Sequence, residues 1–186
     1  MKGYIILGII IFVIILLVSW IIKTYNNLVQ LRNKVKDQWS QVDVQLKRRF
    51  DLIPNIVETV KGYAKHEKDT LTAVIEARNI AVSATNPADE MNADNKLSGA
   101  LSRLFALTEA YPELKADKNF QDLQENLKDV EDKIAFARQF YNDTVLKYKN
   151  AIEMFPANLI AGLLGFKQEQ FFQATEEEKE NVKVQF

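Results

Sequence analysis

Residues 3–22 read GYIILGIIIFVIILLVSWII, a run of twenty residues without a charge between Lys2 and Lys23. Fifteen of the twenty are Ile, Leu, Val or Phe. At about 1.5 Å of rise per residue the run makes roughly 30 Å of helix, which matches the hydrocarbon core of a bilayer. At roughly 0.3 to 0.6 kcal/mol for each large apolar residue, insertion gains on the order of 5 to 9 kcal/mol. The run therefore predicts a membrane-spanning helix, and residues 1–24 are interpreted as an N-terminal transmembrane anchor.

A cleaved signal peptide is the alternative interpretation of this run. The apolar region of a signal peptide is normally about 7 to 15 residues long and ends in small residues at a cleavage site. The run here is longer, and it closes with Leu17, Val18, Ser19 and Trp20, which lack the small-x-small pattern. We therefore expect an anchor that stays in the membrane.

Positive charge lies mainly on the C-terminal side of the run. Only Lys2 precedes it, whereas four cations follow before the first acidic residue: Lys23, Arg32, Lys34 and Lys36. Lys and Arg within about 15 to 20 residues of a span favour the cytoplasmic side. The sequence thus predicts a single-pass protein of the cell membrane, with its N-terminus outside and its domain in the cytoplasm.

Beyond the run, apolar residues recur at alternating intervals of three and four, as they do on one face of an α-helix. One series runs through residues 28–64 and resumes at 71–81, and a second runs through 120–155. Between them, Asn86-Pro87 offers an N-cap followed by a proline at the first helical position, and Tyr111-Pro112 offers an end. The pattern predicts an all-α fold with coiled-coil-like spacing.

As one straight helix, the stretch from residue 25 to residue 85 would span roughly 90 Å. That is too long to pack along the second helical series at residues 120–155, so the chain must turn back within this stretch. Two places for a turn compete. Asp51-Leu-Ile-Pro54 supplies a possible cap and a proline, and Gly62–Lys68 interrupts the apolar series. The series keeps its phase through the proline, so a kink there is an alternative to a turn. Either turn predicts an antiparallel up-and-down four-helix bundle over residues 25–156.

A last segment, residues 157–186, begins with apolar residues, and a four-pass bundle would bring its start back toward the bilayer. We favour a tail that covers the end of the bundle, because exposed apolar segments usually pack on their own domain. The alternative is contact with the membrane surface through five side chains: Leu159, Ile160, Leu163, Leu164 and Phe166. Residues 182–184 are the one short run with strand character.

Three segments of the chain resemble the bacterial LemA family. They are WSQVDVQLKRRFDLIPNIVETVKGYAKHE at residues 39–67, LSGALSRLFALTEAYPELKADKNF at 97–120 and IAFARQFYNDTVLKYKNAIEMFP at 134–156. The resemblance runs from about Tyr25 to Phe166. It implies an N-terminal span followed by a four-helix up-and-down bundle, and it brings neither an agreed biochemical activity nor a catalytic motif.

The residues that would carry catalysis or metal binding are scarce in this sequence. There is no cysteine, and the single histidine, His66, has Tyr63 three residues before it instead of the glutamate of a di-metal bundle. The serines lack the Gly-x-Ser-x-Gly pattern of a nucleophile elbow. The near balance of 24 basic and 25 acidic residues argues against a nucleic-acid partner. We expect no catalytic residue, no metal site and no cofactor.

Lys47, Arg48 and Arg49 form the densest basic cluster, which can bind an acidic segment of a partner. On a helix the cluster lies roughly 38 Å beyond the span, several Debye lengths from lipid headgroups. Partner binding is therefore favoured over lipid binding. Ordinary pairing with Asp43, Asp51 or other acids of the bundle is favoured over both.

The combination of anchor, bundle and missing chemistry predicts a non-enzymatic interaction module or scaffold. Its partners would be the lipid bilayer, through residues 3–22, and an unidentified membrane or envelope protein or a second copy of the chain. A second hypothesis is a membrane-organising or envelope-remodelling protein that uses its apolar tail. A third, an enzyme with unrecognised carboxylate chemistry, would require inward-facing acids where the apolar series place hydrophobic side chains.

Overall fold

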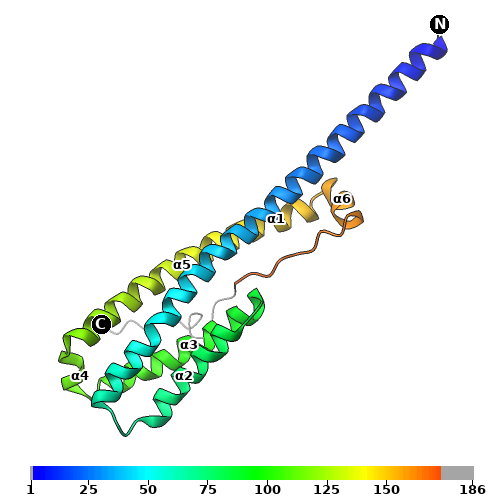
Figure 1. Cartoon of the computed structure of the whole chain (residues 1–186). Helices are drawn as coiled ribbons and strands as arrows, with labels where there is room; N and C mark the ends of the chain where they lie inside the picture. The colour runs from blue at the N-terminus through cyan, green and yellow to red at the C-terminus, as the bar shows by residue number, and fades with distance from the viewer. Residues whose placement is uncertain (1, 173–186) are drawn as a thin grey trace, which may run out of the picture. The chain divides into compact units, whose positions relative to one another are not determined.

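The computed structural model describes residues 2–172, and every regular element in that range is an α-helix (Figure 1). The helices are α1 (Lys2–Tyr63), α2 (Lys68–Ser83), α3 (Pro87–Thr108), α4 (Pro112–Ala116), α5 (Lys118–Glu153) and α6 (Ala157–Leu163). The run at 182–184, with its predicted strand character, lies outside the described residues. The chain forms two compact units: the first joins residues up to Gln38 with Tyr141–Phe171, and the second joins Trp39–Phe140 with Phe172.

The beginning of α1 carries the predicted span. Within residues 2–172, α1 is the one helix long and apolar enough to cross a membrane, with a mean hydropathy of 3.4 over an 18-residue window that is 0% buried. After that window the apolar residues turn inward, and Leu28 and Val35 are 1% and 3% exposed. The same helix thus changes from apolar on all sides to apolar on one side, as its sequence pattern predicts.

The turn of the first helical stretch follows Tyr63, and Pro54 lies inside α1. Of the two predicted places for a turn, the structure has the one at Gly62–Lys68. A proline inside a helix leaves the carbonyl four residues earlier without its N–H donor, and here that carbonyl belongs to Phe50. The Nε of Arg78 in α2 donates to the Phe50 oxygen at 2.9 Å. A side chain from the next helix therefore replaces the hydrogen bond that Pro54 cannot make.

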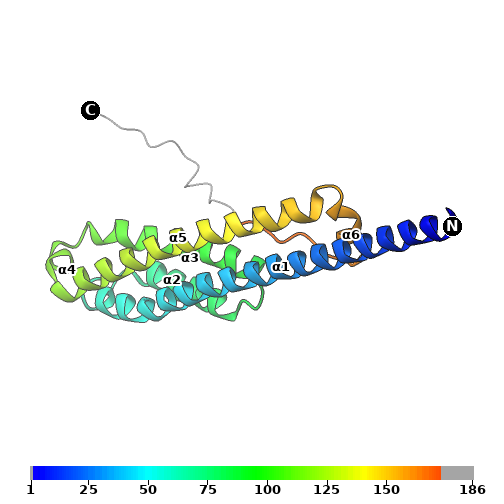
Figure 2. The same cartoon turned by 90° about the horizontal axis from the view of Figure 1, so that it is seen from above.

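The second unit has one interior, shared by α2, α3 and parts of α1 and α5. Figures 1 and 2 show α2 and α3 side by side, and their backbones pack against each other. The predicted apolar series supply the buried side chains, among them Val42, Leu46, Ile53, Val60, Val74, Leu97, Leu104 and Ile134. The start of α3 confirms the predicted cap, because Asn86 Oδ1 accepts the Asp89 N–H at 3.0 Å and Pro87 is the first helical residue.

The first unit packs the end of α5 and the chain after it against α1. Tyr141, Tyr148 and Ile152 of α5 are 2%, 1% and 8% exposed. In α6, Ile160 and Ala161 are buried, whereas its other large apolar residues remain exposed. The segment after residue 156 thus buries one face within its own unit and leaves the opposite face open.

Candidate functional site

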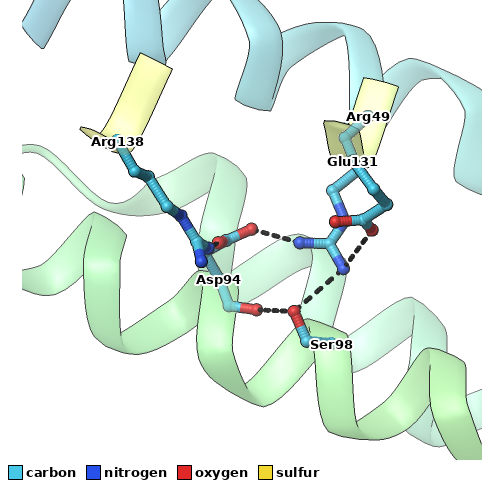
Figure 3. A network of polar contacts seen from close by, with 5 residues as sticks. All are labelled: Arg49, Asp94, Ser98, Glu131 and Arg138. Carbon is cyan, nitrogen blue, oxygen red and sulfur yellow. Dashed lines mark hydrogen bonds and ion pairs between the residues drawn. The ribbon is translucent and has the colours of Figure 1, made fainter. Parts of the chain in front are cut away.

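Five polar residues come together in the interior of the second unit, and we call them the buried charge cluster: Arg49, Asp94, Ser98, Glu131 and Arg138 (Figure 3). Arg49 belongs to α1, Asp94 and Ser98 to α3, and Glu131 and Arg138 to α5. Asp94 is 0% exposed and Arg49 is 1% exposed. Three helices therefore meet at charged side chains where an apolar core is the rule.

Asp94 lies between two guanidinium groups. Its Oδ1 accepts a hydrogen bond from Arg49 Nη1 at 2.5 Å, and its Oδ2 pairs with Arg138 Nη2. Arg49 Nη2 reaches two more acceptors, Ser98 Oγ at 3.0 Å and Glu131 Oε1 at 2.8 Å. The guanidinium of Arg138 also lies 4.0 Å from the ring centroid of Phe172. Two positive and two negative charges thus balance in one network, which allows Arg49 and Asp94 to be buried, while Glu131 is 39% exposed at its edge.

Helical spacing places these residues inward. Arg49 stands three residues after Leu46 and four before Ile53, and Asp94 stands three residues before Leu97. Both positions continue the buried faces of their helices. The prediction that apolar residues alone take the inward positions is wrong at Arg49 and Asp94. The available signal was a charged residue in phase with an apolar series on two different helices, with opposite signs.

The residues of the buried charge cluster bind one another and thereby hold α1, α3 and α5 together. Ser98 Oγ donates to the backbone oxygen of Asp94 at 3.0 Å while it accepts from Arg49, so its proton is held by a carbonyl. Both oxygens of Asp94 are engaged by arginine. Among residues 2–172, no group of three or more His, Cys, Asp or Glu side chains is placed to hold a metal ion.

The predicted basic cluster is divided by the structure. Lys47 is exposed and pairs with Asp43 at 2.8 Å, the ordinary pairing that the sequence analysis favoured. Arg48 is exposed. Arg49 points into the interior, so it is not part of a surface that a partner can reach together with Lys47 and Arg48. One helical position separates the two environments, because neighbouring residues on a helix face different directions.

An open groove lies beside the buried charge cluster. Its volume is about 770 Å³, and its lining comes from α1, α3 and α5: Arg49, Ser98, Leu101, Ser102, Phe105, Gln121, Gln124, Glu125, Leu127, Lys128 and Glu131. Leu101 and Leu127 are buried and supply an apolar floor, whereas Gln121, Gln124 and Lys128 are exposed. An apolar floor with a few polar groups is the composition of a binding groove. Sequence patterns do not reveal this groove, since it depends on how α1, α3 and α5 lie against one another.

Comparison with known proteins gives a family and several relatives. The profile of the LemA family matches residues 38–186. Protein LemA of Metamycoplasma hominis is 28% identical over 161 residues, which cover 84% of this chain and 72% of that protein. Magnetosome protein MamQ 2 of Paramagnetospirillum magneticum is 24% identical, over 86% of this chain and 68% of that protein. Magnetosome protein MamQ of Magnetospirillum gryphiswaldense is 24% identical, over 83% of this chain and 66% of that protein. The predicted resemblance is thereby confirmed, and the chain belongs to the LemA family.

Proposed function

We propose that this protein is a membrane-anchored, non-enzymatic interaction module: residues 3–22 span the cell membrane, and residues 25–156 form an antiparallel up-and-down four-helix bundle that presents a docking groove. The membrane assignment is supported by the exposed apolar start of α1. The bundle is supported by the side chains of α1, α2, α3 and α5 that share the interior of the second unit. The charged groups in that interior bind one another, which leaves them to hold helices together.

The groove between α3 and α5 is the observation that carries the interaction function. A helix of a membrane or envelope protein, or of a second copy of this chain, suits it: the apolar floor can take the apolar face of such a helix, and the rim offers amide and charged groups for its polar side chains. Gln124 on the rim is exposed, so a photo-reactive residue placed there would contact an occupant first.

The test is site-specific crosslinking in membranes. With the photo-reactive residue at position 124, we expect a discrete adduct that disappears when Leu101→Lys places a charge on the groove floor. The matched control places the same residue at Glu76, an exposed position on α2 outside the groove. Mass spectrometry of the adduct then separates a foreign membrane protein from a second copy. Equal labelling from both positions, or no adduct from either, would contradict the proposal.

For orientation we propose that the second unit lies in the cytoplasm and the N-terminus lies outside. Residues 23–65 carry nine basic and four acidic residues, which favours the cytoplasmic side for the segment after the span. Because the chain has no cysteine, single cysteines at Lys2 and at Glu113 can be labelled without background. A membrane-impermeant maleimide on intact cells should label the first position and spare the second. The reverse pattern would place the domain outside.

The alternative function, organisation of the membrane by the segment after residue 156, is favoured by the exposed leucines of α6. It requires that α6 contact the bilayer next to the anchor.

A further inference from the structure

The chain from Met154 to Phe166 reads MFPANLIAGLLGF, thirteen residues without a charge. It begins directly after the last residue of α5 and contains all of α6 and the turn after it. Five of its large apolar side chains are strongly exposed: Met154 64%, Phe155 79%, Leu159 65%, Leu163 86% and Leu164 50%. Removing one such side chain from water gains roughly 1.5 to 3 kcal/mol. A cluster of this size on a soluble surface normally marks an interface.

The two faces of α6 differ sharply. Ile160 is 8% exposed and Ala161 is 2% exposed, whereas Leu159 and Leu163, one helical turn apart, point away from the unit. Ile160, which is among the predicted membrane contacts, is packed within its own unit. Helix α6 therefore exposes its two leucines and buries its opposite side within the unit.

The turn after α6 fixes the helix against α1. Gly165 has a φ of 70°, and the Phe166 N–H donates to the Ala161 oxygen at 3.0 Å, which is the hydrogen bond of a Schellman C-cap. The turn directs Phe166 to Tyr25, with ring centroids 6.0 Å apart and an edge-on geometry. The guanidinium of Arg32 lies 5.2 Å from the same ring. Phe166 is thus a half-buried residue that makes internal contacts in the first unit.

The contact with Tyr25 places α6 at the level where α1 leaves the membrane. Tyr25 follows the last residue of the run, Ile22, by three positions, or about 4.5 Å along a helix. Figure 1 shows α6 beside α1 in this part of the unit. Headgroups surround α1 at that level, since they form a layer of several ångströms outside the hydrocarbon core.

We propose that the exposed apolar face of α6 and its flanking residues, formed by Met154, Phe155, Leu159, Leu163 and Leu164, lies in the headgroup–acyl boundary of the bilayer that α1 spans. This inference rests on the proposed membrane anchor. The occupant is lipid because residues 3–22 of the same unit are exposed, and the contact between Phe166 and Tyr25 places this face close to the end of that apolar run. Lys23, Lys149 and Lys167 lie in the same unit, and from Lys23 onward, past the span, that unit has seven basic and four acidic residues. An excess of positive charge beside an apolar face is the composition of an interfacial helix on anionic lipid.

The experiment uses the full chain in vesicles of phosphatidylcholine with a minor fraction of phosphatidylglycerol, with or without bromine on the acyl chains. A polarity-sensitive fluorophore is attached to one introduced cysteine at a time. The test position is Asn158, an exposed polar residue of α6, so the label does not replace an apolar contact. The control is Leu146→Cys, because Leu146 is 48% exposed in the same unit but lies on α5 roughly 10 Å before its end. Ile11→Cys, in the middle of the span, reports insertion of the anchor.

Brominated lipid should quench the label at 158 by at least about twofold more than the label at 146, as expected for a segment held at the acyl boundary. Leu159→Ser together with Leu163→Ser should remove most of that difference, and both residues are exposed, so these changes leave the core of the unit intact. Equal quenching at 158 and 146, with strong quenching at 11, would overturn the α6 inference and leave the anchor standing. Absence of quenching at position 11 would instead overturn the proposed anchor.

Discussion

Asp94 holds a negative charge where its side chain has no exposed surface, between Arg49 and Arg138. Its carboxylate contacts both guanidiniums, so it neutralises positive charge on α1 and α5 at once. Asp94 would contribute little to stability if the two guanidinium groups could be solvated by water instead. Arg49, at 1% exposure, cannot do so without opening the unit.

Asp94→Asn keeps the shape of the side chain and removes its charge. We expect the free energy of unfolding, measured by urea titration in detergent, to fall by about 3 to 5 kcal/mol, because two arginines lose the carboxylate that pairs with both of them. The control is Asp129→Asn, which breaks the exposed pair with Lys133 at 2.6 Å and should cost less than about 1 kcal/mol. Equal losses of unfolding free energy in the two variants would show that the buried pair contributes no more to stability than the exposed pair.

The buried phenol of Tyr141 makes the stability of the fold depend on pH in the alkaline range. Burial, and to a lesser extent the negative charge of Glu169, raise the pKa of Tyr141 from 10 to about 12, and its hydroxyl donates to the Gln170 oxygen at 2.9 Å. The folded state therefore favours the neutral phenol. This contribution is fully present below the unfolded pKa of 10 and is lost as the pH rises through about 12.

Tyr141→Phe should make the decline in unfolding free energy between pH 10 and about 12 shallower by on the order of 2 kcal/mol. At neutral pH the same variant should be about 1 kcal/mol less stable, since it lacks the hydrogen bond to the backbone. Urea titrations across this pH range measure both effects. An identical pH dependence in the two proteins would contradict the assigned cause.

Among the helices, α1 shows how one element depends on another. Pro54 deprives the Phe50 carbonyl of its helical donor, and Arg78 of α2 supplies a replacement. Arg78→Met should destabilise the protein by about 1 to 2 kcal/mol, because a carbonyl in a buried residue loses its partner. Pro54→Ala restores the helical N–H, so it should stabilise the Arg78→Met variant by about 1 kcal/mol more than it stabilises the wild type. Additive effects in this double-mutant cycle would mean that Arg78 acts on something other than the Pro54 defect.

The same helices show which features sequence patterns can predict. The cap at Asn86 and the inward positions of Val42, Leu46 and Leu97 depend on local spacing, and local spacing is visible in a sequence. Passage of the helix through Pro54 depends on a donor 24 residues away, because Arg78 is 78 − 54 = 24 positions along the chain. A periodic pattern alone therefore leaves a turn and a continuous helix open at that proline.

The inward arginine and aspartate escaped prediction for a related reason. A charged residue on an apolar face is normally read as an interruption, since burial of one unpaired charge is strongly unfavourable. Arg49 and Asp94 are acceptable inside only as a pair, and the pair becomes visible once two helices are placed side by side. The groove between α3 and α5 could not be predicted for the same reason, because it too depends on how helices lie side by side.

For the whole molecule, the free energy of insertion of the proposed membrane anchor can be tested by adding charges to it. Phe12→Arg near the middle of the span should cost about 3 to 4 kcal/mol of the predicted 5 to 9 kcal/mol of insertion, so the variant should stay in the membrane. Adding Leu16→Arg raises the cost to roughly 6 to 8 kcal/mol, which uses up the margin.

Alkaline carbonate extraction of membranes distinguishes these outcomes. The single variant should remain in the pellet, and the double variant should appear in the supernatant. Release of the single variant would show that the span inserts with far less free energy than its composition predicts. Retention of the double variant would point to attachment by something besides residues 3–22.

The buried charge cluster also sets an order of events during synthesis. Arg49 leaves the ribosome 45 residues before Asp94 and 131 − 49 = 82 residues before Glu131. At about 5 to 20 residues per second, the second interval lasts roughly 4 to 16 s. The hydrophobic N-terminus has been translated before any of these partners exist, so capture of the nascent chain at the membrane precedes closure of the second unit. Throughout that interval the guanidinium of Arg49 stays hydrated, and it gives up its water only when the last third of the chain arrives.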